Sequence, residues 1–177
     1  MSADYVSPKP SGLSKPTVER IAEAIAETLG FRPGGSMEAV VSRFGGKIVV
    51  GTNGDDDVES GSIVARSMSD FTIYISQFTS LVRDRFTIAH ELGHLLLHLD
   101  VVQKLKPDAV MRATRWVDES NQEQKRAEWE ANWFAAAFLM PAKAFSEIYQ
   151  KDGPNEAQRV FGVSPKAVEI RAKSIGL

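Results

Sequence analysis

The sequence predicts an α+β domain, with a small, mainly antiparallel sheet packed on helices and a helical C-terminal end. Three observations predict this class. Apolar residues recur at helical spacing near both ends of the chain, short runs rich in β-branched and aromatic residues cluster between residues 47 and 76, and two long helical patterns follow at 83–98 and 121–140. With several strand candidates so close together, a small antiparallel sheet is the simplest arrangement.

Composition narrows the class of protein. Of the 177 residues, 43% are hydrophobic and 25% are charged, and the formal net charge is −2. These values argue against a disordered chain and against a polycation that coats nucleic acid. The chain has no Cys, which excludes disulfides and thiolate metal sites. Any transition-metal site must therefore use His, Asp or Glu.

We expect residues 1–16 to form a flexible tail, because Pro, Ser and Lys dominate there and no apolar pattern repeats. This stretch does not resemble a signal peptide, and no apolar run elsewhere approaches the roughly 20 residues that span a bilayer. The sequence thus predicts a cytoplasmic protein with no membrane partner. We expect one folded domain over 17–153, followed by a helical segment over 154–177 that resembles a helix-turn-helix.

The first half of the domain is predicted to hold two helices and three strands. Helices are expected from Thr17 as N-cap to Gly30, and from Ser36 to Gly45. Strands are expected over KIVVG, SIVARS and FTIYIS, at 47–51, 62–67 and 71–76. An acidic stretch between the first two strands lacks the ligand pattern of a calcium loop and is expected to be a solvated turn. Its acidic residues are Asp55, Asp56, Asp57 and Glu59.

The second half is predicted to be helical. A broad apolar face extends over 83–98, and good helix formers fill 121–140 up to Pro141. A further helix is expected over 141–150, and two short helices at the end, where Ser164 is the cap of the second. Four aromatic residues recur at helical spacing and are expected in the core: Trp129, Trp133, Phe134 and Phe138.

The candidate chemistry lies on the 83–98 helix, which holds all three histidines of the chain. Residues four apart differ by about 40° around a helix and about 6 Å along it, so His90 and His94 can direct imidazole nitrogens at one point. Without thiolates, such a pair best suits Zn²⁺. His98 lies about 80° around the helix from His90, fits the same metal poorly, and is expected at the solvent or helix end.

Glu91 completes the pattern H-E-x-x-H. Its place directly after the first histidine lets its carboxylate reach a water on the metal rather than the metal itself. The metal lowers the pKa of that water, and Glu91 can accept its proton as the general base. The pattern therefore predicts hydrolysis of a peptide bond.

A catalytic zinc site needs a third protein ligand, and the 121–140 helix offers Glu128 and Glu130. These differ by about 200° around the helix, so at most one faces the metal. Glu128 shares a face with Asn132, whose amide can orient the far nitrogen of a ligating histidine. We therefore expect Glu128 as the ligand and Glu130 as a solvated residue whose replacement has little effect.

Two blocks of the sequence resemble the ImmA/IrrE family of bacterial and phage zinc metallopeptidases. They are RDRFTIAHELGHLLLH (83–98) and EWEANWFAAAFLMP (128–141), and a similar order of elements extends over about 17–177. The resemblance implies that the 17–153 region is a zinc metallopeptidase domain. It also implies that His90 and His94 bind zinc, that Glu91 is the general base, and that Glu128 is the third ligand.

The resemblance further implies a substrate. Members of this family typically cleave a helix-turn-helix transcriptional repressor, often encoded beside them, and so relieve repression in stress, DNA damage or mobile-element control. We therefore expect a zinc-dependent endopeptidase with such a repressor as partner. The alternative is a catalytically silent or DNA-binding regulatory module, which the basic residues of the helical end favour and the slightly acidic chain disfavours. These residues are Arg159, Lys166, Arg171 and Lys173.

Two features of substrate binding are left as hypotheses. Tyr74, Tyr149 and Arg85 are candidates for stabilising the tetrahedral oxyanion, and the sequence does not choose among them. The strand at 71–76 directly precedes the histidine helix, so a free edge of this strand is expected to bind an extended substrate segment beside the metal.

Overall fold

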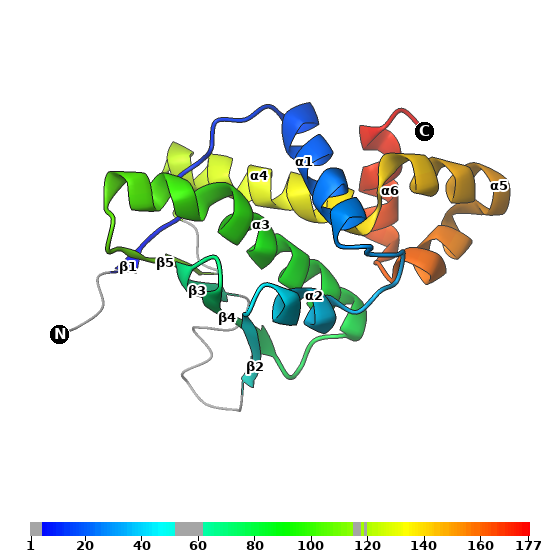
Figure 1. The fold of residues 1–177 in the computed structure, drawn as a ribbon. Helices are drawn as coiled ribbons and strands as arrows, with labels where there is room; N and C mark the ends of the chain where they lie inside the picture. The colour runs from blue at the N-terminus through cyan, green and yellow to red at the C-terminus, as the bar shows by residue number, and fades with distance from the viewer. Residues whose placement is uncertain (1–4, 52–61, 115–117, 119) are drawn as a thin grey trace.

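The structure is a computed structural model that describes residues 5–51, 62–114, 118 and 120–177 (Figure 1). It confirms the α+β class. The acidic stretch at 52–61 lies outside the described residues. Within the described ranges, none of the helices is long and apolar enough to pass through a membrane.

In chain order the elements are β1 (Tyr5–Val6), α1 (Lys15–Thr28), α2 (Met37–Arg43), β2 (Lys47–Gly51), β3 (Ser62–Ser67), β4 (Asp70–Ser76), α3 (Leu81–Leu105), β5 (Val110–Ala113), α4 (Gln122–Leu139), α5 (Ala142–Phe161) and α6 (Pro165–Ser174).

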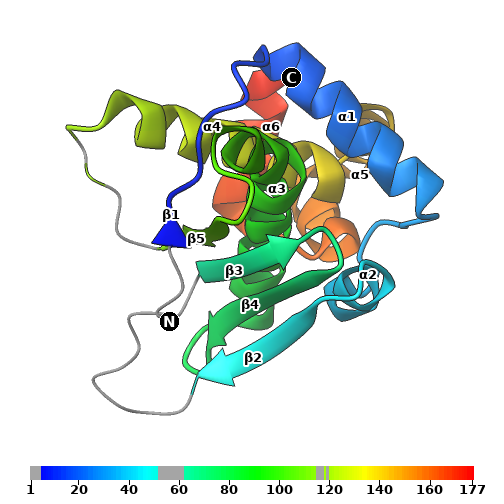
Figure 2. The ribbon, with the colours of Figure 1, turned by 60° about the vertical axis from the view of Figure 1, so that its left-hand side comes forward.

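The strands form one sheet in the order β1-β5-β3-β4-β2 (Figure 2). The antiparallel pairings are those of β3, which lies between β4 and β5, a strand that the sequence did not predict. The edge strands pair parallel to their neighbours: β1 with β5, and β2 with β4. The sheet is thus antiparallel at its centre and parallel at both edges.

The strand expected to offer a free edge does not have one. β4 lies between β3 and β2, with Ile73 opposite Ile63 on one side and Ile48 on the other. Its backbone groups are therefore used on both sides, and a substrate segment cannot add to it. The hypothesis was wrong because β2 pairs with the outer side of β4. The sequence does not show this pairing, since β2 precedes the β3–β4 pair in the chain.

α3 is the central helix of the molecule. One side of α3 lies on β3 and β4, and α4 packs on another side of α3. α1 packs in turn on α4 (Figures 1 and 2). Because sheet and helices cover it together, α3 is buried along most of its length between Ile88 and Val102. A helix buried on several sides is expected to carry apolar residues around much of its circumference. The histidines therefore lie on a helix that is held firmly from two directions.

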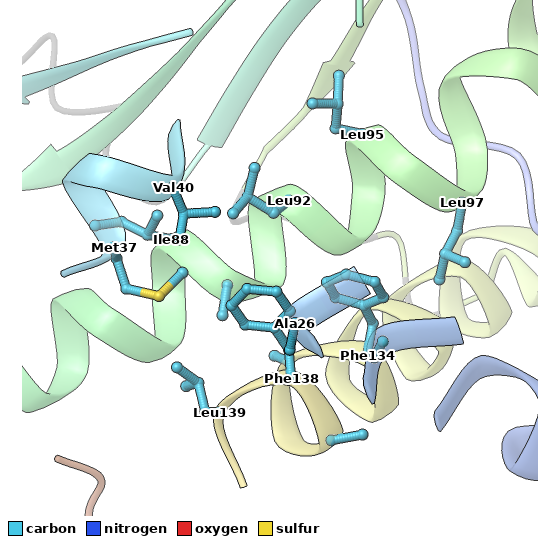
Figure 3. Packing of buried hydrophobic residues seen from close by; sticks show 14 of the residues in the cluster. Ala26, Met37, Val40, Ile88, Leu92, Leu95, Leu97, Phe134, Phe138 and Leu139 are labelled. Carbon is cyan, nitrogen blue, oxygen red and sulfur yellow. The ribbon is translucent and has the colours of Figure 1, made fainter. Parts of the chain in front are cut away.

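Phenylalanine side chains fill the space between α3, α4 and α1 (Figure 3). Phe134 and Phe138 stack with ring centroids 5.8 Å apart, and Phe31 contacts Phe138 at 4.7 Å. Both α4 phenylalanines are buried, as predicted, and Trp133 is partly buried against the same core. The prediction was wrong for Trp129, whose exposed fraction is 53%, because it lies on a different side of α4 from its buried neighbours Ala127, Glu130 and Ala131.

α3 and α4 approach each other most closely at Gly93. A Cβ atom added at Gly93 would lie 3.1 Å from the Ala131 Cα and carbonyl oxygen, and 3.2 Å from the Phe134 Cβ. The absence of a side chain therefore lets the backbone of α4 lie directly on the histidine helix. This short separation brings acidic side chains of α4 to the histidines of α3.

We expect Gly93→Ala to lower the free energy of unfolding by about 1 kcal/mol, and by at most about 2 kcal/mol. Overpacking at a close helix contact lowers the free energy of unfolding by about 1–3 kcal/mol, and the better helix propensity of Ala offsets about 1 kcal/mol of this loss. Chemical denaturation of the two proteins, both free of metal, measures the difference. A variant as stable as the wild type would show that the two helices separate at no cost.

The described part of the N-terminal segment, residues 5–14, packs on the domain, within the stretch 1–16 for which a flexible tail was expected. Tyr5 and Val6 pair with β5, and Pro8 is buried. The backbone of Ser11 donates a hydrogen bond to Glu130 on α4, and Arg126 donates one to the carbonyl of Leu13. Polar composition predicted flexibility, but the polar groups of this segment are satisfied by α4 instead of by water.

The C-terminal helices form as the sequence predicted. α5 is kinked at Gly153, which adopts φ 84° and ψ 176° directly before a proline. The side chain of Ser164 caps α6 by accepting a hydrogen bond from the Ala167 amide, and Pro165 occupies the first turn. Arg171 of α6 is only 1% exposed and forms ion pairs with Glu19 and Glu23 of α1, which fix α6 to the rest of the domain.

Candidate metal centre

Three side chains from α3 and α4 converge at one point. His90 Nε2 lies 3.2 Å from Glu128 Oε2, His94 Nε2 lies 3.1 Å from Glu128 Oε1, and the two imidazole nitrogens are 3.0 Å apart. The sequence predicted these three residues as the ligands. They form the one group of potential metal-binding side chains found among the described residues, with all ligand atoms within 4.8 Å of one another.

The spacing of these atoms fits a metal ion. A tetrahedral zinc site with bonds of about 2.0–2.1 Å places its ligand atoms about 3.3 Å apart, within a few tenths of an ångström of the observed distances. Two imidazoles and one carboxylate are also the donor set of several catalytic zinc sites. The residues present therefore fit Zn²⁺ by both distance and donor chemistry.

The far nitrogen of His90 contacts the residue predicted to orient it. His90 Nδ1 lies 3.0 Å from the side-chain oxygen of Asn132, one helical turn beyond Glu128 on α4. An amide oxygen can only accept, so Nδ1 carries the proton and donates, and Nε2 keeps a free lone pair. This contact prepares His90 to bind a metal through Nε2.

The ionisation of two of the ligands also suits a metal. Burial lowers the pKa of His94 to about 3, although the nearby carboxylate of Glu128 acts in the opposite direction. Burial alone would raise the pKa of Glu128, but the adjacent imidazoles of His90 and His94 outweigh it and hold this pKa well below its ordinary value. Near neutral pH, His94 is therefore neutral and Glu128 is charged, the forms in which both bind metal.

Glu91 lies beside the ligands but has a different environment. It is only 3% exposed, and its Oε2 atom has no hydrogen-bond partner among the described residues. Burial raises the pKa of Glu91 to about 7, the negative charge of Glu128 adds to this, and His90 opposes it. A carboxyl group that gains and loses a proton near neutral pH is suited to general acid–base catalysis.

Glu91 makes the stability of the metal-free protein pH-dependent. Its pKa is higher in the folded protein, about 7, than its ordinary value of 4.5, so the folded state binds the proton more tightly. Its contribution is fully present below about pH 4.5 and is lost as the pH rises through 7. We expect the free energy of unfolding to fall by roughly 3 kcal/mol relative to Glu91→Gln over this range. Denaturation of both metal-free proteins at pH 5 and pH 8 tests this, and parallel pH profiles would contradict it.

The centre opens into a hollow of about 590 Å³. None of the three oxyanion candidates lines it. Arg85 instead donates hydrogen bonds to the carbonyls of Gly35, Phe161 and Gly162, which makes it a structural residue. The sequence analysis did not single out Arg83 and Thr87, which do line the hollow. They precede His90 and Glu91 by seven and four residues on α3, a helical spacing that the sequence displays.

His98 and Glu130 were misplaced by the sequence analysis. Both side chains are fully buried, and His98 Nε2 lies 3.0 Å from Glu130 Oε2. Glu130 was expected to face solvent and His98 to lie at the solvent or helix end. Both expectations were wrong because the N-terminal segment covers this side of α4 and because α3 continues to Leu105, well past His98. His98 is not part of the group that could bind the metal, in agreement with the prediction.

Comparisons with known proteins agree with this geometry. A peptidase family model described as an IrrE N-terminal-like domain matches residues 57–173, well over half of the chain. Among solved structures, a Mycobacterium tuberculosis transcriptional regulator is similar, with a TM-score of 0.58 and 20% sequence identity. The similarity covers 86% of this chain and 45% of the regulator, so the chain spans less than half of the regulator's length. At this identity the likeness shows the fold alone. No curated protein matches the sequence.

Proposed function

The chain belongs to the peptidase family with the IrrE N-terminal-like domain, and from this premise we propose that it is a zinc-dependent endopeptidase that cleaves a helix-turn-helix transcriptional repressor. One observation carries the proposal. Three metal-binding side chains converge beside a buried carboxyl group with no hydrogen-bond partner for one of its oxygens among the described residues. A structural metal site does not need such a group, whereas metal-assisted hydrolysis needs a base beside the metal.

In this mechanism His90, His94 and Glu128 hold the metal. When bound, Zn²⁺ supplies Lewis acidity, which acidifies a water molecule and polarises a peptide carbonyl. Glu91 lines the same hollow, and its carboxylate accepts a proton from the water as the oxygen attacks the carbonyl carbon. The carboxyl group then donates that proton to the leaving nitrogen, and the products are a new carboxyl terminus and a new amino terminus.

The surroundings of the centre support a peptide as the substrate. A second hollow of about 470 Å³ shares Phe86, Asn132, Ser164 and Ala167 with the first. Its walls include the apolar side chains of Trp133, Ala136, Met140 and Ile170. An extended peptide with its cleaved bond at the metal can place a large apolar side chain there, since apolar walls favour such a group.

The repressor is proposed from the family resemblance. Family members that resemble this chain act on helix-turn-helix repressors, and the description of the solved neighbour as a transcriptional regulator is in keeping with a regulatory role. Relief of repression in stress, DNA damage or mobile-element control would follow from the cleavage. Such a repressor acts on DNA in the cytoplasm, so we propose the same location for this protein.

The substrate is tested with a helix-turn-helix repressor encoded beside the gene, the partner that the family resemblance implies. The zinc-loaded protein is incubated with this repressor and, as a matched control, with an unrelated helix-turn-helix repressor of similar size. We expect one or a few cuts in the neighbouring repressor only, read by gel electrophoresis and intact mass. Cleavage of both repressors alike would contradict the specific substrate but keep the peptidase, and cleavage of neither would contradict the proposal.

Direct DNA binding is the alternative that the basic C-terminal residues favoured. In the structure each of them is paired: Arg159 with Glu156, Lys166 and Lys173 with Glu169, and Arg171 with Glu19 and Glu23. The paired carboxylates reduce the net positive charge of this face, and binding to phosphates depends on that charge. We therefore expect no binding of duplex DNA that weakens steeply with salt. Fluorescence anisotropy at two salt concentrations tests this, and a steep salt dependence would favour the alternative.

A further inference from the structure

A chain of buried side chains connects the candidate ligand His94 to the N-terminal segment. His94 Nδ1 lies 3.0 Å from His98 Nδ1, and His98 Nε2 lies 3.0 Å from Glu130 Oε2. All three side chains are at most 1% exposed. The direct contacts of the metal centre do not account for His98 or Glu130, yet a buried charge is costly to keep unless it serves as a partner to other groups.

The direction of each hydrogen bond in this chain follows from its end. The Glu130 carboxylate can only accept, so His98 donates from Nε2. When His98 carries a single ring proton, its Nδ1 is unprotonated and must accept from the protonated Nδ1 of His94. His94 in turn keeps the free lone pair on Nε2, the nitrogen that lies 3.1 Å from Glu128 at the metal centre. One carboxylate thus determines the tautomers of two imidazoles.

Glu130 is held in its charged form by donors from outside α3. Its Oε2 accepts from the backbone nitrogen and the hydroxyl of Ser11, at 2.8 and 2.7 Å. Its Oε1 accepts from the backbone nitrogen of Gly12 at 3.1 Å and from Arg126 Nε at 3.0 Å. With His98, these donors occupy both oxygens of the carboxylate. The carboxylate therefore acts only as an acceptor.

The donors of the N-terminal segment lie outside the region that the family model matches. That region is 57–173, whereas Ser11 and Gly12 belong to the ordered segment between β1 and α1. Arg126 fixes the same segment by donating from Nη2 to the carbonyl of Leu13 at 2.7 Å. Among the described residues of the segment, none lines the hollow at the metal centre, and Glu130 connects the segment to His98 and His94.

We propose that Glu130 and His98 are positioning residues, which, together with Ser11 and Gly12 of the N-terminal segment, hold His94 in the tautomer that presents Nε2 to the metal. Carboxylate–histidine pairs commonly orient metal ligands, and here a second imidazole is inserted between the carboxylate and the ligand. His90 is oriented separately, by Asn132. The proposal rests on the proposed metal centre but not on the identity of the substrate.

The tautomers can be read directly in the metal-free wild type. The chain has three histidines, so its imidazole nitrogen spectrum contains three ring systems. Long-range proton–nitrogen correlation near neutral pH is expected to show a protonated Nδ1 for His94 and a protonated Nε2 for His98. A His94 ring protonated at Nε2 instead would overturn the proposal without any variant.

Glu130→Gln tests the effect on the metal. The glutamine amide can donate as well as accept, so it no longer determines the direction of the chain. We expect zinc affinity, measured by competition with a chelator, to fall by about 10–100-fold, and the imidazole spectrum to show a changed or mixed tautomer for His94. The matched control is Glu123→Gln on the same helix, which removes only the ion pair with Lys9 and is expected to keep both properties.

Ser11→Ala is a milder second variant, which tests the same network if Glu130→Gln does not fold. It removes one donor to Glu130 from an otherwise intact network, and we expect a smaller loss of zinc affinity in the same direction. A purely structural role predicts a lower melting temperature of the metal-free variants with unchanged zinc affinity and an unchanged tautomer, and this result would overturn the proposal. A wild type that bound no zinc would contradict the metal centre and the proposed function as well. Failure of the positioning role alone would instead leave zinc binding by the wild type intact, so the two results can be told apart.

Discussion

Replacement of Glu91 by glutamine is expected to lower the rate of peptide hydrolysis by about 10²–10⁴-fold while zinc stays bound. The amide is nearly the same size as the carboxyl group, so the buried space beside His90 and Glu128 is filled as before. It cannot accept the proton of the attacking water, however, and it cannot return a proton to the leaving nitrogen. Single-turnover cleavage of the repressor, with the zinc content of both proteins measured, gives the comparison.

The control for this experiment is Asn132→Ala. It leaves the proton-accepting group intact and removes only the contact that orients His90, so we expect weaker zinc binding but substantial cleavage at saturating zinc. The Glu91 variant should show the opposite combination. If Glu91→Gln cleaved the repressor at the rate of the wild type, another group would have to be the base.

Replacement of Glu128 by alanine is expected to have the largest effect on the metal. Glu128 is the only carboxylate in the group that could bind it, and the variant leaves two imidazoles as protein ligands. The loss of zinc affinity should exceed the roughly 10–100-fold expected for Glu130→Gln, because a ligand is lost and not merely its support. Chelator competition on folded protein measures both.

Glu123→Ala is the matched control for Glu128→Ala, since it removes an exposed carboxylate from the same helix. It should leave zinc affinity unchanged. A Glu128→Ala variant that bound zinc as tightly as the wild type would show that Glu128 is not a ligand. The unfolding of the metal-free variant should be measured as well, since loss of the contacts with His90 and His94 affects the fold independently of zinc.

Local patterns in the sequence predicted the elements that build the centre. The spacing of His90 and His94 depends only on helix geometry, and the structure places both Nε2 atoms 3.0 Å apart. Ser36 and Ser164 cap α2 and α6 through their side chains, as their positions before apolar runs indicated. Such features were predictable because each involves residues close together in the chain.

The errors at the site concern groups that meet from distant parts of the chain. Glu130 was assigned to a solvated face of α4, yet Ser11, more than a hundred residues earlier, covers it. The strand β4 was expected to have a free edge, but β2 pairs with it in parallel. Composition and periodicity describe one element at a time, so they show which side of a helix is polar but not whether another segment supplies hydrogen bonds to that side.

The most direct test of the account is to cleave the repressor in water labelled with oxygen-18 and to weigh the intact products. The account predicts two fragments whose masses sum to that of the repressor plus one labelled water, with the label on the new carboxyl terminus. This cleavage should stop when a chelator removes the metal and return when zinc is restored. Fragments without the label, or a cleavage rate unaffected by removal of the metal, would contradict hydrolysis at the centre formed by His90, His94 and Glu128.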